Sequence, residues 1–291
     1  RAWEGHIRHG WRRDEVVRAL AGAPGLRKQP DENDGPYKAS WDVVPGRNVD
    51  LGAVRRPLRA RGPDVTAAPA ARSEPSMIAF TFPGQGSQRP GFGEAWTGHP
   101  SWELVEEATG AAGRDVAHLL LHAEAEELQE TRNAQLATYV ASMVALDAVE
   151  RLGVSPALVA GHSLGEYSAL TAAGVVSFEE GVRLVVERGE AMQRAADERA
   201  GSMASVLGLD EDQVAVACAR AGGDVWAANY NAPGHTVVAG TPEGLESAKV
   251  VAKELGARKV VPLKVGGAFH SPLMAGARDR LAKALDAPVW R

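Results

Sequence analysis

A serine between two glycines is the feature of this sequence best suited to covalent chemistry. Residues 161–165 read Gly-His-Ser-Leu-Gly and stand between a short apolar run and a helical stretch at residues 166–173. The glycines permit a tight strand-to-helix turn that holds the Ser163 oxygen out of the sheet. The Leu164 amide and the helix N-terminus then face the negative charge that develops in acyl transfer. The same five residues would also form a glycine-rich turn in which the serine caps the following helix, so a purely structural role stays open.

Ser163 needs a base, because a serine hydroxyl is a weak nucleophile at neutral pH, and histidine is the usual one. His270 is the best candidate of eight histidines, since residues 266–272 place it in a glycine-bounded loop after an apolar strand, where backbone can approach a substrate. A loop histidine bonded to a carbonyl is the alternative. The other seven are expected in the N-terminal segment, in loops, on helix surfaces or within the serine turn: His6, His9, His99, His118, His122, His162 and His235.

One arginine departs from the charge pattern of its helix. At about 100° per residue, the other charged side chains of residues 178–197 fall on one helical face. Arg188 instead lies between Leu184 and Met192 on the apolar arc. An arginine in that position requires an anionic partner, which is either a structural carboxylate or a ligand. A planar guanidinium suits a substrate carboxylate, which it binds through two parallel hydrogen bonds.

Two glutamines lie at positions that suggest a role in a site. Gln85 lies in residues 83–88, Pro-Gly-Gln-Gly-Ser-Gln, after the first strand candidate. This loop lacks the Lys-Ser/Thr ending of a Walker loop and the full dinucleotide-binding spacing, but its amides could form half of an oxyanion hole. Gln135 falls in the apolar stretch 134–149, where core hydrogen bonding is the alternative to a role in a pocket.

The elements that must position these residues follow from residue 77 onward, where short apolar runs alternate with helical stretches. Strands are predicted at 78–82 and 157–160 and helices at 134–149 and 178–197, the last with Ser177 and Glu180 at capping-box spacing. This alternation favours a mostly parallel sheet covered by helices. Beyond residue 200, four strands and two helices suit a small α+β insert; the strands are expected at 203–209, 225–229, 236–239 and 258–263 and the helices near 210–221 and 242–255.

The first 76 residues differ in composition from the rest. Residues 1–75 are net basic and hold eight prolines, with an Arg-rich run at 55–61 and an Ala/Pro-rich stretch at 66–75 that is typical of a linker. Only residues 15–21 look helical. Because the chain begins at Arg1, it looks like a fragment or a fusion, with Met77 as the natural start of an independent unit. No function is assigned to this segment.

Composition narrows the remaining function classes. The chain has 291 residues, 45% of them hydrophobic and 24% charged, and a net charge of −5, so neither nucleic-acid nor membrane-surface binding is expected. Its longest uncharged apolar runs fall short of the roughly 20 residues that a membrane-spanning helix needs. The single cysteine, Cys218, cannot form an internal disulfide, and no Cys/His spacing suggests a metal site. We expect a cytoplasmic monomer without metal.

Six motifs, taken in order, together resemble one enzyme family, the malonyl-CoA:acyl carrier protein transacylases. They are residues 82–88, 133–135 (Asn-Ala-Gln), 161–166, 188–193 (Arg-Gly at its start and Met-Gln at its end), 229–234 and 269–274. The resemblance covers about residues 77–285. It implies an α/β fold: a large α/β-hydrolase-like domain with a parallel sheet at 77–199 and 262–291, interrupted by a ferredoxin-like subdomain at 200–261. The family's longer C-terminal portion is incomplete here, residues 287–291 look like a prematurely joined piece of it, and residues 1–76 stay unassigned.

The resemblance also implies roles for particular residues. Ser163 becomes the nucleophile and His270 its base. The amides of Gln85 and Leu164 would form an oxyanion hole, and Arg188, with Gln135 beside it, would bind the malonyl carboxylate. Phe269 would favour malonyl over methylmalonyl groups. Contacts with an acidic carrier protein would come from Arg258, Lys259 and Lys264.

The activity that these roles imply is acyl transfer by an S-malonyltransferase. Malonyl would pass from malonyl-CoA to the phosphopantetheine thiol of acyl carrier protein through a malonyl-serine, in fatty-acid synthesis and without a metal or redox cofactor. Three alternatives stay open: an acyltransferase of a polyketide pathway, a truncated and inactive carrier-binding module, and a simple esterase or thioesterase.

Overall fold

A computed structural model describes residues 26–28, 41–43 and 78–286 of the chain, which divides into two compact units, Arg1–Pro75 and Ser76–Arg291. In the first unit, β1 (Leu26–Lys28) pairs antiparallel with β2 (Trp41–Val43). Neither strand is among those predicted from the sequence. The helix expected at 15–21, the linker at 66–75, Met77 and residues 287–291 lie outside the described residues.

The second unit begins with a parallel strand pair. β3 (Ala79–Phe82) pairs with β4 (Leu158–Gly161), and their last residues, Phe82 and Gly161, lie opposite each other. Parallel strands need a long crossover, which here consists of short helices followed by one long one. These are η2 (Glu94–Trp96), η3 (Pro100–Trp102), α4 (Glu103–Ala112), α5 (Val116–Leu121), α6 (Ala125–Gln129) and α7 (Thr131–Glu150).

Two long helices form the centre of this unit. α9 (Phe178–Glu198) packs against α7, and α8 (Gly165–Ala172) follows β4 directly. The predicted capping box is present at the start of α9. Glycines bring α7 and α9 close together: a Cβ on Gly181 would overlap the Tyr139 hydroxyl, and one on Gly189 would lie 2.9 Å from the Arg132 Cα. The apolar core of this part lies around α7 and α9.

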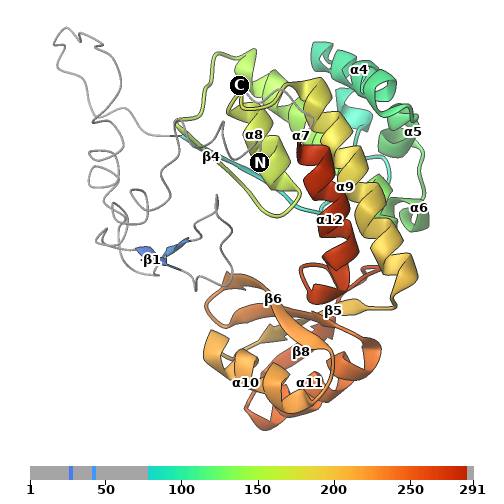
Figure 1. Ribbon diagram of the computed structural model, residues 1–291. Coiled ribbons are helices and arrows are strands. Elements are labelled where there is room, and N and C mark those ends of the chain that lie inside the picture. Colours follow the sequence, from blue (N-terminus) through green and yellow to red (C-terminus); the bar gives the residue numbers. More distant parts are fainter. Residues whose placement is uncertain (1–25, 29–40, 44–77, 287–291) are drawn as a thin grey trace, which may run out of the picture. The chain divides into compact units, whose positions relative to one another are not determined.

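The predicted insert forms a second, antiparallel sheet, drawn at the lower end of Figure 1. Its elements are β5 (Ser202–Leu207), α10 (Glu211–Ala221), β6 (Val225–Ala232), β7 (His235–Gly240), α11 (Pro242–Glu254) and β8 (Lys259–Pro262). The strand order β6-β7-β5-β8 with this β-α-β-β-α-β sequence is the ferredoxin-like arrangement. The fold class is therefore α/β with a ferredoxin-like insert, whereas the domain boundaries at residues 200 and 261 stay a prediction.

The two faces of this sheet pack against different parts of the molecule. On one face, side chains such as Val206 and Val238 contact α10 and α11. On the other, Met203 and Ala239 share a core with Met192 of α9 and with the segment around residues 268–277. The chain then continues through η4 (Pro272–Met274) into α12 (Ala275–Leu285), which runs beside α9 (Figure 1). The loop that carries His270 is thereby held between the sheet and α9.

Within residues 78–286 and the two short strands, none of the helices is long and apolar enough to cross a bilayer. The same part of the chain contains no group of three or more His, Cys, Asp or Glu side chains placed to hold a metal ion.

Candidate active site

Ser163 lies in a tight turn between β4 and α8. Its φ of 53° falls in the left-handed region, which costs energy for a residue other than glycine and is typical of nucleophile elbows. Neither flanking glycine leaves room for a side chain. A Cβ on Gly161 would overlap the Gly165 backbone, and a Cβ on Gly165 would overlap the carbonyl of Phe82. The turn therefore has the elbow geometry that the sequence predicts.

His270 meets Ser163 across 107 residues of sequence. The Ser163 Oγ and the His270 Nε2 lie 2.9 Å apart, within hydrogen-bonding distance. His270 also has a left-handed φ, 59°, and its loop is fixed by the Ser271 hydroxyl, which donates to the Ala268 carbonyl at 2.6 Å. Both members of the pair thus sit at strained backbone positions, which are concentrated at functional sites.

Several other histidines have structural partners. His99 accepts from the amide of Ser101 at the start of η3, His118 pairs with Glu127 at 3.0 Å, and His235 lies 2.8 Å from the Ser205 hydroxyl. His162 packs against Gly84, where an added Cβ would meet the imidazole Nδ1 at 2.8 Å. Among the described histidines, His270 is the one that contacts Ser163.

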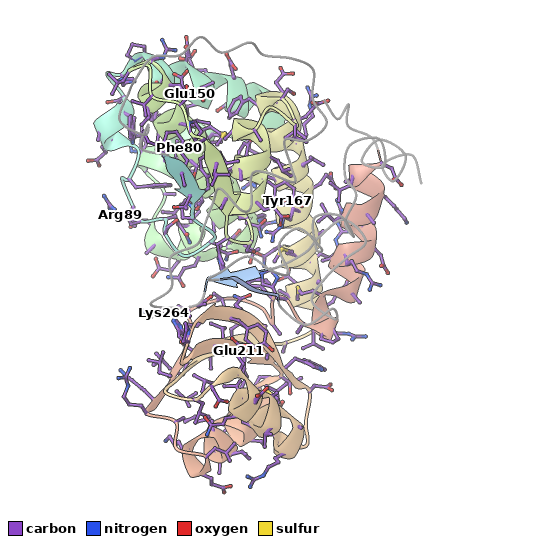
Figure 2. The ribbon with its side chains drawn as sticks, turned by 90° about the vertical axis from the view of Figure 1, so that its left-hand side faces the viewer. Phe80, Arg89, Glu150, Tyr167, Glu211 and Lys264 are labelled. Atoms are coloured by element: carbon purple, nitrogen blue, oxygen red, sulfur yellow. The ribbon has the colours of Figure 1, made fainter. Side chains whose placement is uncertain are left out.

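Arg188 is buried, with 8% of its surface exposed, and reaches the same serine. Its Nη2 donates to the Ser163 Oγ at 3.0 Å, and its Nη1 donates to the Gln135 Oε1 at 2.6 Å. The Tyr167 ring centroid lies 5.6 Å from the guanidinium carbon, close enough for a cation–π interaction; Figure 2 shows Tyr167 beside α9. Burial lowers the pKa of Arg188 from its ordinary value and raises that of Tyr167.

None of the groups that hydrogen-bond or stack with Arg188 is a carboxylate, and Glu166 attracts it only from beyond ion-pair distance. No ion pair within 4.0 Å joins Arg188 to an Asp or Glu of the described residues. Gln135 is fully buried and its Nε2 contacts the Met192 Sδ at 3.3 Å, so it cannot turn to water. A buried charge that is held by neutral groups leaves electrostatic capacity for an anion.

The two amides predicted for an oxyanion hole belong to the elbow and to the loop that packs against it. Leu164 is buried and directly precedes α8, and Gln85 follows Gly84, which packs against His162. Neither amide donates a hydrogen bond to another described residue in turns or loops, whereas the neighbouring Gly86 amide donates to the Gln88 side chain. This arrangement is compatible with the predicted hole, and the role itself stays a prediction.

A cavity of about 470 Å³ opens beside Arg188 and His270. Its other walls come from Met192, from the segment before α12 and from α12 itself: Ser271, Pro272, Met274, Ala275, Ala277, Arg278 and Leu281. A second cavity of about 460 Å³ lies between β3 and α7 and includes neither Ser163, His270 nor Arg188 in its walls. The first cavity has Arg188 and His270, though not Ser163, in its walls and is therefore the one that lies at the candidate site.

The remaining predicted residues lie around this centre. Phe269 is buried in the core that joins α9 to the second sheet. Arg258, Lys259 and Lys264 are exposed at or near β8, and no ion pair joins them to an acidic side chain among the described residues; Figure 2 shows Lys264 at the surface. Sequence reasoning missed Tyr167 and the contact of Arg188 with Ser163. The spacing of Tyr167, four residues after Ser163 on α8, was the available signal for the first.

Comparison with known proteins assigns most of the chain to one family model, which is described as an acyl transferase domain and matches residues 79–289. A second model, described as sucrose-6F-phosphate phosphohydrolase, matches residues 1–70. The malonyl CoA-acyl carrier protein transacylase of Bacillus subtilis is 44% identical over 217 residues, which are 73% of this chain and 68% of that protein.

Solved structures agree with this similarity. The acyl-carrier-protein S-malonyltransferase of Burkholderia pseudomallei superimposes with a TM-score of 0.70 at 41% identity, over 74% of this chain and 71% of that one. A malonyl-transacylase solved in complex with a type II PKS acyl-carrier protein gives a TM-score of 0.71 at 38% identity, over 74% and 72%. The range that the family model matches, residues 79–289, includes Ser163, His270, Arg188 and Gln135.

Proposed function

The chain belongs to the acyl transferase domain family, and on that premise we propose that it transfers malonyl groups from malonyl-CoA to acyl carrier protein in fatty-acid synthesis. The observation that carries the choice of substrate is Arg188, a buried guanidinium that contacts the Ser163 hydroxyl and the Gln135 amide but no described carboxylate. A malonyl group brings a carboxylate at one end and a reactive thioester at the other, which suits a cation next to a nucleophile.

The first half-reaction forms a malonyl-serine. Because Arg188 already donates to the Ser163 Oγ, the hydroxyl can donate its own proton to the His270 Nε2. The Oγ–C bond forms at the thioester carbon, and the tetrahedral oxyanion is stabilised by the amides of Gln85 and Leu164. The C–S bond then breaks, and His270 returns the proton to the departing CoA thiolate.

The second half-reaction reverses these roles with a new thiol. His270 takes the proton of the carrier protein's phosphopantetheine thiol, the sulfur attacks the serine ester, and the leaving Ser163 oxygen regains that proton. These are acid–base and acyl-transfer steps, so they need no redox group. The single cysteine supports a reducing, cytoplasmic setting, and we propose that the enzyme acts as a monomer.

The carboxylate site also accounts for selectivity. An acetyl group would leave Arg188 buried without an anionic partner, whereas malonyl supplies one. Phe269 is proposed to disfavour a methyl branch on the malonyl group. Arg258, Lys259 and Lys264 are proposed to attract an acidic carrier protein, because they are exposed cations near the strand that leads to the His270 loop.

The decisive experiment is incubation with malonyl-CoA followed by intact-mass measurement. The protein should gain one malonyl group, and Ser163→Ala should gain none. Absence of an adduct on folded protein would favour a carrier-binding module without activity. An esterase would hydrolyse neutral esters regardless of Arg188, whereas Arg188→Ala should lower malonyl transfer far more than acetyl transfer.

A polyketide pathway is the second candidate, because one of the similar structures is a complex with a type II PKS acyl-carrier protein. Both pathways use the same chemistry at Ser163. Steady-state transfer to a fatty-acid carrier protein and to a polyketide carrier protein, measured side by side, separates them: the fatty-acid assignment predicts the higher kcat/KM with the first.

A further inference from the structure

We propose that Gln193 is a positioning residue for the substrate carboxylate site, an inference that rests on the function proposed above. Gln193 lies on α9 and does not touch Ser163 or His270. Its Oε1 accepts a hydrogen bond from the backbone amide of Thr131, at the first residue of α7, over 2.8 Å. By fixing α7 against α9, this bond holds Gln135 in register with Arg188.

The start of α7 needs such a partner. The first amides of a helix have no acceptor within the helix, and a side chain at the N-cap usually supplies one. In α7 the N-cap residue Glu130 makes no such side-chain hydrogen bond. Thr131 is buried, so water cannot easily replace the missing acceptor. A side chain of α9 therefore does the capping that the local sequence does not.

The placement of the contacts explains why this bond affects the site. Thr131 lies one helical turn before Gln135, and on α9 Gln193 lies five residues after Arg188. Between them, Gly189 allows α9 to approach the backbone of Arg132. The Gln193–Thr131 and Arg188–Gln135 bonds thus join the same two helices on either side of a close contact. A slide of α7 along α9 would lengthen the 2.6 Å bond between Gln135 and Arg188.

The other end of the Gln193 side chain offers a control. Its Nε2 donates to the Asp197 Oδ1 at 2.9 Å, on the exposed side of α9. Asp197→Ala removes that acceptor and leaves the bond to Thr131 intact. If Gln193 only stabilised α9, loss of either contact would have similar effects. If it positions Gln135, only loss of the Thr131 bond should alter recognition of the malonyl carboxylate.

The bond can be removed from either partner without disturbing the catalytic residues. Gln193→Leu deletes the acceptor from a half-buried site. Thr131→Pro deletes the donor at a position where proline suits a helix, since it is the first helical residue and the preceding Glu130 has φ −57° and ψ 128°. The Thr131 hydroxyl has no hydrogen-bond partner among the described residues, so no side-chain bond is lost. Gln193→Glu keeps an acceptor and serves as the conservative variant.

The measurement is the rate of Ser163 acylation by malonyl-CoA and by acetyl-CoA, each followed by intact mass on the full chain, with a thermal melt for every variant. Gln193→Leu and Thr131→Pro should each lower the malonyl-to-acetyl rate ratio about three- to tenfold, the effect of one hydrogen bond. The double variant should show no larger loss than either single one, because both remove the same bond. Gln193→Glu and Asp197→Ala should retain the wild-type ratio.

An unchanged ratio in folded Gln193→Leu and Thr131→Pro would overturn the positioning role, and so would equal losses with both substrates or additive losses in the double variant. Failure of one variant to fold leaves the other to decide. A wild-type chain that gains a malonyl adduct while its variants keep the ratio refutes this inference alone. A folded wild-type chain that gains no adduct refutes the proposed function and this inference with it.

Discussion

At the scale of single residues, the site is organised around a buried cation, Arg188, that has no carboxylate in direct contact among the described residues. The groups in direct contact with Arg188 are Gln135, Ser163 and the Tyr167 ring, all neutral, and Glu166 adds an attraction from beyond ion-pair distance. Neutral partners satisfy hydrogen-bonding groups but balance little charge. The free protein therefore holds a guanidinium that a substrate carboxylate can stabilise, which links the unfavourable burial of Arg188 to selectivity for malonyl groups.

Gln135→Glu tests this interpretation directly. The new carboxylate would lie beside the Arg188 Nη1, where the amide oxygen is now 2.6 Å away, and would compete with the substrate. We expect KM for malonyl-CoA to rise about ten- to a hundredfold, as for loss of a charge-assisted hydrogen bond. The melting temperature should rise or stay constant, because the buried charge gains a partner. Initial rates and a thermal melt measure both quantities.

Gln135→Leu is the matched control for that variant, because it removes the amide without adding charge. It should lower the melting temperature, since it leaves the Arg188 Nη1 without its acceptor. If both substitutions weakened malonyl-CoA binding and stability alike, Gln135 would be a packing residue and the electrostatic account would be wrong.

At the scale of elements, the packing of α10 against the second sheet can be tested through the burial of its cysteine. Cys218 lies on α10 and packs partly into the core beneath the sheet, where burial raises the pKa of its thiol to about 11. The unfolded thiol ionises near its ordinary value of about 8.5. Above about pH 8.5 the thiol ionises in the unfolded chain but stays protonated in the folded one. The contribution of Cys218 to the free energy of unfolding is therefore fully present below about pH 8.5 and is lost as the pH rises toward 11.

We accordingly expect Cys218→Ala to show a shallower loss of stability than the wild type between these two pH values. Chemical denaturation of both proteins at pH 7, 9 and 10.5 gives the difference between their free energies of unfolding. Lysines and tyrosines that titrate in the same range are present in both proteins, so their effect cancels in this difference. Parallel curves would show that the thiol is as well solvated in the folded chain as in the unfolded one.

Elements with local signals are the ones that sequence analysis predicts correctly. Ser177 with Glu180 forms the predicted capping box of α9, and the predicted helix α10 begins with a second box, Asp210 with Gln213, that was not predicted. The crossover helices α4 to α6 were missed. Shortness accounts for two of them: α5 has six residues and α6 five, and the local signal of α5 is only its N-cap Asp115. The helix α12 was also missed.

Contacts between elements were harder to predict than the elements. The apolar position of Arg188 correctly indicated a buried cation, but not that it reaches Ser163, since this depends on how α8 and α9 pack. The strand order β6-β7-β5-β8 likewise depends on pairings that are distant in sequence. The glycine-bounded loop made His270 a candidate base for Ser163, and the resemblance to a family then added the spatial information that one sequence lacks.

At the scale of the whole molecule, carrier-protein recognition should be separable from acylation of the enzyme. Arg258 and Lys259 are exposed at the start of β8, while Ser163, Arg188 and His270 come from the elbow before α8, from α9 and from the loop after β8. Arg258→Glu with Lys259→Glu should lower kcat/KM for an acidic carrier protein about tenfold or more at low salt. Malonyl-serine formation should stay unchanged.

Assays over a range of salt concentrations check that prediction, because screening should reduce the difference between wild type and variant. Exchange of Lys253 and Arg220 for glutamate, on the helices α11 and α10, is the control for net charge alone. A similar loss in that control would indicate long-range attraction rather than a contact surface.

The division of the chain into two compact units leads to the last prediction. The unit that begins at Ser76 contains Ser163, His270, Arg188 and Gln135, and the acyl transferase model matches within it, at residues 79–289. The hydrogen bonds that define the site all join residues of this unit. A chain that begins at Met77 should therefore form the malonyl-serine adduct within about twofold of the full chain's rate, the range expected for changes remote from a site. Time-resolved intact mass of the two chains, each beside its Ser163→Ala variant, measures this. A shortened chain that folds but acylates far more slowly would mean that residues 1–76 contribute to the active site, and the acyltransferase could not then be treated as one independent unit.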